Sequence, residues 1–157
     1  MGQQYHGQLS TSLGPISFAV DAAGRLVELR FAALIGRRPD RDSRCDRVAE
    51  QLAEYLAGDR TRFDLDTAAN GTAFQRRVWR ALQDIPYGVV VSYGEIARRI
   101  DMPNAARAIG QANGANPIPI VVPCHRVIAA DGTIGGFSGG LAIKQQLLAI
   151  ERVRLAA

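Results

Sequence analysis

Cys124 and His125 are adjacent in the chain, and this pair of side chains can do nucleophilic chemistry. The thiolate is the reactive form of cysteine, and a neighbouring imidazole is one of the few groups that can generate it near neutral pH. Hydrophobic runs rich in β-branched residues, 120–122 and 127–128, lie on both sides of the pair and predict two buried strands with the cysteine between them. The alternative is a cysteine that only packs as a small apolar residue.

The remaining cysteine and histidine suggest neither a metal site nor a disulfide scaffold. Cys45 and His6 show no metal-ligand spacing with the reactive pair, so we expect no metal and no cofactor. Two cysteines far apart in the sequence are typical of a reducing, cytosolic compartment. Arginines beside Cys45 favour a lower thiol pKa, but we interpret it as an incidental cysteine at a helix start.

The composition is that of a globular, basic protein. The chain has 157 residues, 47% hydrophobic and 22% charged, and can bury a core as one domain or two small ones. A net charge of +4 fits a polyanionic partner. No apolar run approaches the roughly 20 residues that span a bilayer, and the N-terminus lacks a signal-peptide pattern. We therefore expect a cytoplasmic protein without membrane association.

The first half of the chain predicts a small sheet and one helix, with no catalytic residue. A turn at 13–15 precedes an apolar segment, 16–20, and turn residues 21–24 lead to an alternating segment, 26–31, that can complete a hairpin. Apolar residues at helical spacing predict a helix over 46–57 with Gly58 as its C-cap.

Small and turn-forming residues at 66–71 divide the chain into an N-terminal structural α/β domain, 1–68, and a C-terminal domain, 69–157, that carries the chemistry. The first helix of the second domain opens with a capping box formed by Thr72 and Gln75 and ends at 86–88. Its charged face is expected to be solvated, and DNA contact is a secondary interpretation. That face consists of Arg76, Arg77 and Arg80.

A helix-turn-helix is predicted next in the chain. Ser92 and Glu95 form a second capping box that opens a helix over 93–100, residues 101–103 form a tight turn, and a second helix covers 104–112.

The second of these helices has an unusual surface for a DNA reader. Its one arginine, Arg107, stands among Ala105, Ala106, Ala108 and Gly110. A reader of the major groove would carry long polar side chains for the base edges. Small residues around one projecting arginine fit instead a narrow groove and one inserted side chain. Close packing inside the protein is the alternative.

The segments around the cysteine motif predict loops and a last helix. The passage 113–119 is rich in turn residues, and the Asn116 amide can tie that turn to nearby backbone. Asp131 and Gly132 predict a hairpin turn after residue 128. The glycine-rich loop 135–140 lacks a phosphate-loop pattern and favours a pocket lining. A helix is predicted from residue 141 to about Glu151.

Together these motifs resemble the O6-alkylguanine-DNA alkyltransferases, a family of direct-reversal DNA repair proteins. The resemblance rests on SYGE at 92–95, AARA at 105–108, NP at 116–117, PCHRV at 123–127, SGG at 138–140 and Glu151. It implies an α+β protein: a small N-terminal antiparallel-sheet (ribonuclease H-like) domain followed by a mostly helical, winged-helix-like domain with the helix-turn-helix. The first half of the chain fits the family only in outline.

The resemblance implies a suicide methyltransferase that acts on double-stranded DNA containing O6-alkylguanine. The base is flipped through the minor groove, and its O6-alkyl group, or that of O4-methylthymine, moves irreversibly to Cys124 in a single turnover. The protein is expected to be a monomer, with cooperative binding to DNA left open.

The resemblance also implies roles for individual residues. Cys124 is activated through His125, water and Glu151, while the Tyr93 hydroxyl donates to the guanine ring and Asn116 braces the site. The residues expected to meet DNA are Arg107, as a finger that fills the gap in the base stack, with Ala105, Ala106 and Gly110. The residues expected to line the pocket are Tyr93, Val127, Phe137, Ser138 and Gly139. Phe137 replaces a frequent family tyrosine and loses its hydroxyl.

Three other classes of protein remain as alternatives. A non-catalytic alkyltransferase-like protein shares the fold but lacks the cysteine that this chain has. A plain helix-turn-helix regulator would carry base-reading side chains on its second helix. A cysteine hydrolase would need an oxyanion hole, and nothing beyond the Cys-His pair indicates one.

Overall fold

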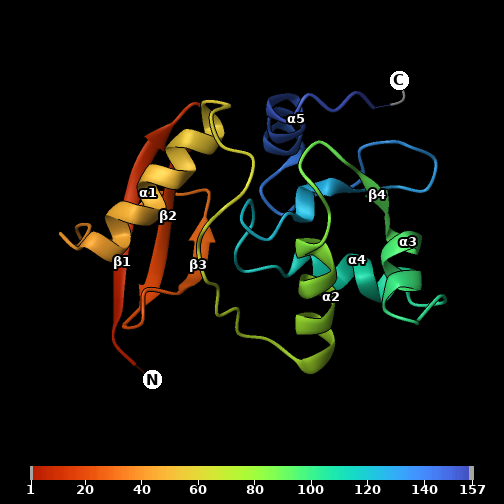
Figure 1. Ribbon diagram of the computed structural model, residues 1–157, viewed down its shortest axis with the longest axis horizontal. Coiled ribbons are helices and arrows are strands. Elements are labelled where there is room, and N and C mark those ends of the chain that lie inside the picture. Colours follow the sequence, from red (N-terminus) through yellow and green to blue (C-terminus); the bar gives the residue numbers. More distant parts are fainter. Residues whose placement is uncertain (1, 156–157) are drawn as a thin grey trace. The chain divides into compact units, whose positions relative to one another are not determined.

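The computed structural model describes residues 2–155 and divides into two compact units, with the boundary between Asn70 and Gly71 (Figure 1). An antiparallel sheet and one helix make up the first unit, and the second is mostly helical. The predicted α+β class is confirmed. No helix within residues 2–155 is long and apolar enough to cross a membrane.

The N-terminal sheet has three strands in the order β1-β2-β3: β1 (Gln4–Thr11), β2 (Gly14–Asp21) and β3 (Leu26–Arg30). The predicted hairpin of 16–20 with 26–31 is present as β2 and β3, whereas β1 was not predicted. β1 pairs with β2 from Gln4–Asp21 to Thr11–Gly14, and Gly7 of β1 leaves room for the ring of Phe18 opposite.

Helix α1 (Ser43–Leu56) covers β1 and β2 with a buried stripe that includes Val48, Leu52 and Tyr55 (Figure 1). It begins earlier than predicted because Asp42 caps it, accepting a hydrogen bond from the Arg44 amide at 2.9 Å. Its C-cap is Ala57, not Gly58 as predicted; Gly58 follows it with φ +81°, the left-handed conformation that ends many helices.

Cys45 lies buried in α1 and is not an activated thiol. Burial, together with the charges of nearby aspartates, raises its pKa to about 11, and the opposite effect of Arg44 is smaller. The interpretation of Cys45 as a structural residue agrees with this environment.

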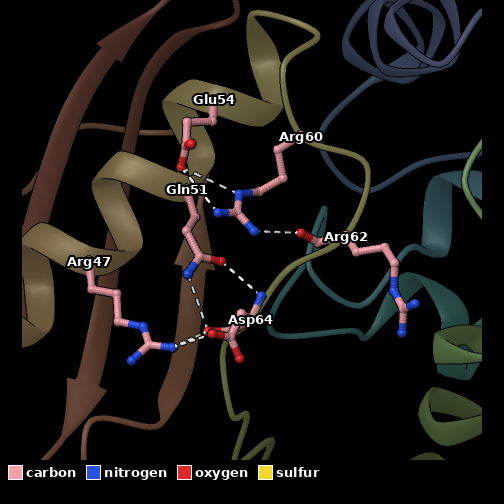
Figure 2. A network of polar contacts seen from close by, with 6 residues as sticks. All are labelled: Arg47, Gln51, Glu54, Arg60, Arg62 and Asp64. Atoms are coloured by element: carbon pink, nitrogen blue, oxygen red, sulfur yellow. Dashed lines mark hydrogen bonds and ion pairs between the residues drawn. The ribbon is translucent and has the colours of Figure 1, made fainter.

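Polar contacts hold the segment after α1 against that helix (Figure 2). The Gln51 amide and the Asp64 backbone exchange two hydrogen bonds, of 2.9 and 3.2 Å, and the Arg47 guanidinium donates to the Asp64 carbonyl at 2.7 Å. Arg60 contacts Glu54 on the same helix at 3.3 Å. The N-terminal unit thus has its own core and its own hydrogen bonds that hold the segment after α1 in place.

The C-terminal unit begins with helix α2 (Ala73–Gln83), and its predicted capping box is present. The Gln75 amide donates to the Thr72 hydroxyl at 3.1 Å, and the Thr72 amide donates to the Gln75 side chain at 2.9 Å. Trp79 is buried and donates its indole N–H to the Ala112 carbonyl at 2.8 Å. This bond ties α2 to α4 (Ala106–Gly114).

The helix-turn-helix consists of α3 (Tyr93–Arg99) and α4, joined by a turn in which Asp101 has φ +59°. Ser92 caps α3 by accepting from the Glu95 amide at 3.1 Å. The reciprocal half of the predicted capping box is wrong, because the Glu95 carboxylate accepts hydrogen bonds from Arg98 and Arg99.

The strand predicted before Cys124 is wrong. Ile120 has φ +74°, and Cys124–Arg126 form a 3₁₀ turn, η1, followed by the two-residue strand β5 (Val127–Ile128). Prolines interrupt the run, and the Asn116 amide donates to the Val122 carbonyl at 2.8 Å in place of a neighbouring strand.

The turn predicted at Asp131 and Gly132 is present, but in the described residues no strand after it pairs with β5 to make a hairpin. The turn closes, with the Ala129 amide donating to the Thr133 carbonyl at 3.1 Å. β5 pairs instead in parallel with β4 (Val91–Ser92), which places the start of α3 beside the segment that follows the cysteine. Helix α5 (Leu141–Ile150) ends the unit close to the predicted boundary.

Candidate active site

Two asparagine side chains hold the backbone around Cys124. Asn113 of α4 donates to the Cys124 carbonyl at 3.2 Å, and Asn116 donates to the Val122 carbonyl while accepting from the Ile118 amide at 3.0 Å. These bonds do the work that a strand partner would otherwise do. Asn116 was expected here from the sequence; Asn113 was not.

The Cys124 thiol is protonated at rest. Its side chain is buried, and burial raises its pKa to about 11, although a hydrogen bond with Asn116 and the charge of Lys144 act in the opposite direction. Such a thiol is a weak nucleophile on its own, so chemistry at Cys124 requires a base that removes its proton during the reaction.

His125 and Glu151 form a buried pair of the kind that can supply this base. The His125 Nε2 lies 2.6 Å from the Glu151 Oε2, and both side chains are shielded from solvent. Burial lowers the pKa of His125, and Glu151 opposes that shift in part. His125 is therefore neutral at rest and able to accept a proton.

Arg126 completes this cluster, and sequence reasoning gave it no role. Its Nε donates to the Glu151 Oε1 at 2.9 Å, its Nη2 to Oε2 at 3.0 Å, and its Nη1 to the Ile85 carbonyl at 2.7 Å. The Gly88 amide also donates to Oε1 at 3.0 Å. Burial alone would raise the pKa of Glu151, but its hydrogen bonds with His125 and Arg126 lower it to about 2.

Lys144 of α5 is a second charged residue that sequence reasoning passed over. It is fully buried and donates to the Val127 carbonyl at 2.7 Å and to the Gly136 carbonyl at 3.0 Å. It thus links β5 to the glycine-rich loop. Burial lowers its pKa to about 8, opposed by its interaction with Cys124. Its place among apolar residues of the last helix was the available sequence signal.

Tyr93, the first residue of α3, lies close to the thiol and the glycine-rich loop. A Cβ atom on Gly135 would lie 3.3 Å from the Tyr93 hydroxyl, closer than most such contacts, so the glycine favours this approach. A Cβ atom on Gly110 would lie at an ordinary contact distance of 3.9 Å from the Tyr93 ring. Burial and the nearby Cys124 raise the pKa of the Tyr93 hydroxyl, which keeps it a hydrogen-bond donor.

The other predicted pocket residues range from buried to exposed. Val127 is buried directly after the cysteine motif. Phe137 and Gly139 are half-buried on the loop before α5, where the Phe137 carbonyl accepts from the Gly140 amide at 3.0 Å. The Ser138 side chain is exposed.

Arg107 projects from α4 beside small residues. Its side chain and Ala106 are exposed, whereas Ala105 and Gly110 are half-buried. Arg98 and Arg99 are paired with Glu95, at 2.7 and 3.3 Å, but no ion pair in the described part of the chain involves Arg107. On α2, Arg76 and Arg77 bind the carbonyls of Gly71 and Ile100.

These features define a class of protein. A helix-turn-helix with one unpaired arginine is a DNA-binding arrangement. A buried cysteine followed in the chain by a buried histidine with a lowered pKa is an arrangement suited to nucleophilic chemistry. No group of three or more possible metal ligands occurs in residues 2–155. The features are those of a DNA-binding protein with a cysteine suited to nucleophilic chemistry.

Comparisons with known proteins identify the family. A family model described as "6-O-methylguanine DNA methyltransferase, DNA binding domain" matches residues 73–153. The methylated-DNA–protein-cysteine methyltransferase of Methanosarcina acetivorans is 42% identical over 94% of this chain and 97% of its own length. The Mycolicibacterium paratuberculosis protein of the same name is 63% identical over 67% of this chain and 64% of its own length.

Solved structures agree with this result. The crystal structure of Mycobacterium tuberculosis OGT in complex with DNA matches with a TM-score of 0.85 and 43% identity, covering 94% of this chain and 92% of that one. Mycobacterium tuberculosis O6-methylguanine methyltransferase matches with a TM-score of 0.86 and 42% identity, over 99% and 96%. The chain belongs to the methylated-DNA–protein-cysteine methyltransferases, with DNA as its partner. The predicted family and enzyme class are confirmed.

Proposed function

We propose that the protein repairs DNA by transferring the O6-alkyl group of guanine, and the O4-methyl group of thymine, to Cys124 in a single turnover. The observation that carries the proposal is the buried pair of His125 and Glu151, 2.6 Å apart, directly after the buried Cys124 in the chain. Burial raises the pKa of Cys124 and lowers that of His125, so a protonated thiol and an uncharged base precede the reaction. A buried thiol meets only a substrate that is inserted into the site.

The damaged base reaches the thiol by leaving the DNA helix. The small residues of α4, with Ala106 exposed and Gly110 half-buried, allow the backbone to approach a narrow groove, and Arg107 fills the space of the extruded base. Unstacking costs a few kcal/mol and is least for a damaged pair, so the inserted arginine helps to hold the flipped state.

The transfer forms one bond and breaks one bond. His125 takes the proton of Cys124 through a water molecule, and the Cys124 sulfur attacks the alkyl carbon. The C–S bond forms while the bond from carbon to guanine O6 breaks, and the electron pair stays on the guanine. A hydrogen bond from the Tyr93 hydroxyl stabilises the negative charge on the ring, and a proton delivered there balances the one that left the thiol.

The product thioether is stable, and the protein is consumed. A thioether sulfur has no acidic proton and is a poor leaving group, so no second step restores Cys124. The free, buried cysteines fit a reducing compartment, and we place the protein in the cytosol as a monomer. Size-exclusion chromatography with light scattering tests the monomer, and a dimer at micromolar concentration would contradict it.

The decisive experiment uses duplex DNA with a radiolabelled methyl group on one O6-methylguanine. We expect one label per protein molecule, located on Cys124 by peptide mapping, and no transfer by Cys124→Ala. The matched control is Cys45→Ala, which removes the other thiol and should keep full transfer. Several methyl groups released per protein would indicate a hydrolase, and DNA binding without transfer would indicate a non-catalytic reader.

A further inference from the structure

Two side chains that can carry positive charge, His125 and Arg126, contact the buried carboxylate of Glu151. Glu151 is 3% exposed, and an ionised carboxylate in such a place is unstable without a positive neighbour. His125 and Arg126 both contact it, His125 through Nε2 and Arg126 through two N–H groups. Which of the two carries the compensating charge decides whether His125 can act as a base.

The geometry of Arg126 makes it the better partner. Its guanidinium presents Nε and Nη2 to the two oxygens of Glu151, the fork arrangement in which arginine binds carboxylates most strongly. The third contact, from Nη1 to the Ile85 carbonyl at 2.7 Å, holds the fork in place from the end of α2. Arginine keeps its charge throughout the accessible pH range.

We propose that Arg126 is a positioning residue of the transfer reaction: it neutralises Glu151, so that His125 stays uncharged until it receives the proton of Cys124. The proposal rests on the proposed function for the role of His125 as a base. Without Arg126, the buried carboxylate would raise the pKa of His125, and His125 would be protonated at rest. The resting pair would then be an imidazolium and a carboxylate. A histidine that is already protonated cannot accept the thiol proton.

The same arrangement selects the histidine tautomer. A carboxylate kept ionised by Arg126 can only accept hydrogen bonds, so the His125 Nε2 must carry the hydrogen of the 2.6 Å contact. The lone pair then lies on Nδ1, which becomes the basic nitrogen. Arg126 therefore fixes both the charge and the orientation of the base without touching the substrate.

Lys144, the other positive charge that acts on His125, does not contact the carboxylate. Burial lowers the pKa of His125, the Glu151 charge raises it, and Arg126 and Lys144 lower it further. Lys144 binds the carbonyls of Val127 and Gly136 instead of the carboxylate. Removal of Arg126 thus leaves Glu151 with His125 as its remaining ionisable partner among these groups.

The test measures single-turnover methyl transfer as a function of pH in the full-length protein. In Arg126→Met the acidic midpoint of the rate should rise by about one pH unit or more, and the rate should recover at high pH. Arg126→Lys, which keeps the charge, should move the midpoint less. A slower rate at every pH with an unchanged midpoint would reduce Arg126 to a packing role and overturn the proposal.

A double variant tests whether the effect of Arg126 on His125 depends on the Glu151 charge. Arg126→Met combined with Glu151→Gln removes both charges, so His125 no longer has a carboxylate to pair with and its midpoint should return toward the wild-type value. A double variant with a midpoint as high as Arg126→Met alone would contradict the charge argument. Arg25→Met, at an exposed ion pair with Asp21, is the matched control and should leave the profile unchanged.

Nitrogen NMR of labelled histidine tests the proposal without any repair assay. The chain has two histidines, so His6 in the N-terminal unit serves as an internal reference. Wild-type His125 should be neutral at pH 7, with its hydrogen on Nε2, and should titrate higher in Arg126→Met. A charged His125, or a hydrogen on Nδ1, in the wild type would overturn the proposal even if every Arg126 variant failed to fold. A failure of methyl transfer with this NMR signature present would count against the proposed function alone.

Discussion

Replacing Glu151 by glutamine should remove a large, acid-sensitive part of the stability of the C-terminal unit. In the wild type, the hydrogen bonds from His125 and Arg126 hold the pKa of Glu151 near 2, against an ordinary value of 4.5. Because each pH unit of such a difference corresponds to about 1.4 kcal/mol, the ionised carboxylate contributes about 3 kcal/mol at neutral pH. Glu151→Gln leaves the Arg126 charge without its partner and should lower the free energy of unfolding by about this amount.

The pH dependence has a definite sign and window. A carboxylate whose pKa is lowered by folding stabilises the native state above the ordinary pKa of 4.5, and this stability is lost as the pH falls toward 2. His125, buried with a lowered pKa, also destabilises the fold in acid, but its loss begins at higher pH, near its ordinary value of 6.5. The loss from His125 therefore begins first as the pH falls, and the loss from Glu151 adds to it below pH 4.5.

Urea unfolding at pH 7, 5 and 3.5 checks this prediction, with tryptophan fluorescence as the probe because Trp79 lies in α2 of the same unit. The wild type should lose stability steeply below pH 5, whereas Glu151→Gln should be less stable at pH 7 and should lose less stability than the wild type between pH 5 and pH 3.5. Equal slopes below pH 5 in the two proteins would refute the assignment of this stability to Glu151.

Three further predictions concern the reaction. Arg107→Ala should slow repair in duplex DNA about tenfold or more, in line with the cost of unstacking, and leave reaction with a free alkylated guanine base nearly unchanged; equal losses on both substrates would remove the finger role. Methylation of Cys124 should lower the free energy of unfolding in urea by about 1–3 kcal/mol, because the added group overpacks a buried site; equal or greater stability would contradict this. Lys144→Met should raise the apparent pKa of Cys124 in an iodoacetamide pH series, because the Lys144 charge favours the thiolate; an unchanged profile would exclude that influence.

Elements with local signals were predictable from the sequence, and elements that depend on distant partners were not. The Thr72 and Gln75 box and the Ser92 cap mark helix starts that the structure retains. β1 has a polar sequence and is a strand because it pairs with β2. The run before Cys124 has the composition of a buried strand, but prolines and the Asn116 amide give its backbone other partners.

The candidate site was predictable to the extent that its residues belong to motifs. Cys124 and His125 are adjacent, but the contact of His125 with Glu151 spans 26 positions and was expected only from the family resemblance. Arg126 and Lys144 received no role, because charged residues are expected to face solvent. Their burial depends on carbonyls and a carboxylate that only the folded chain brings to them.

Because Lys144 is buried, an amine-directed label can report when the C-terminal unit opens. Lys144 is the only lysine in the sequence and is fully buried, so an amine-directed label should react with its side chain only slowly on the folded protein. Slow labelling of Lys144 would then require that α5 separate from β5 and the glycine-rich loop. The rate of labelling at the Lys144 Nζ would measure the transient opening of the C-terminal unit. This rate could be compared between the unmodified protein and the protein alkylated at Cys124.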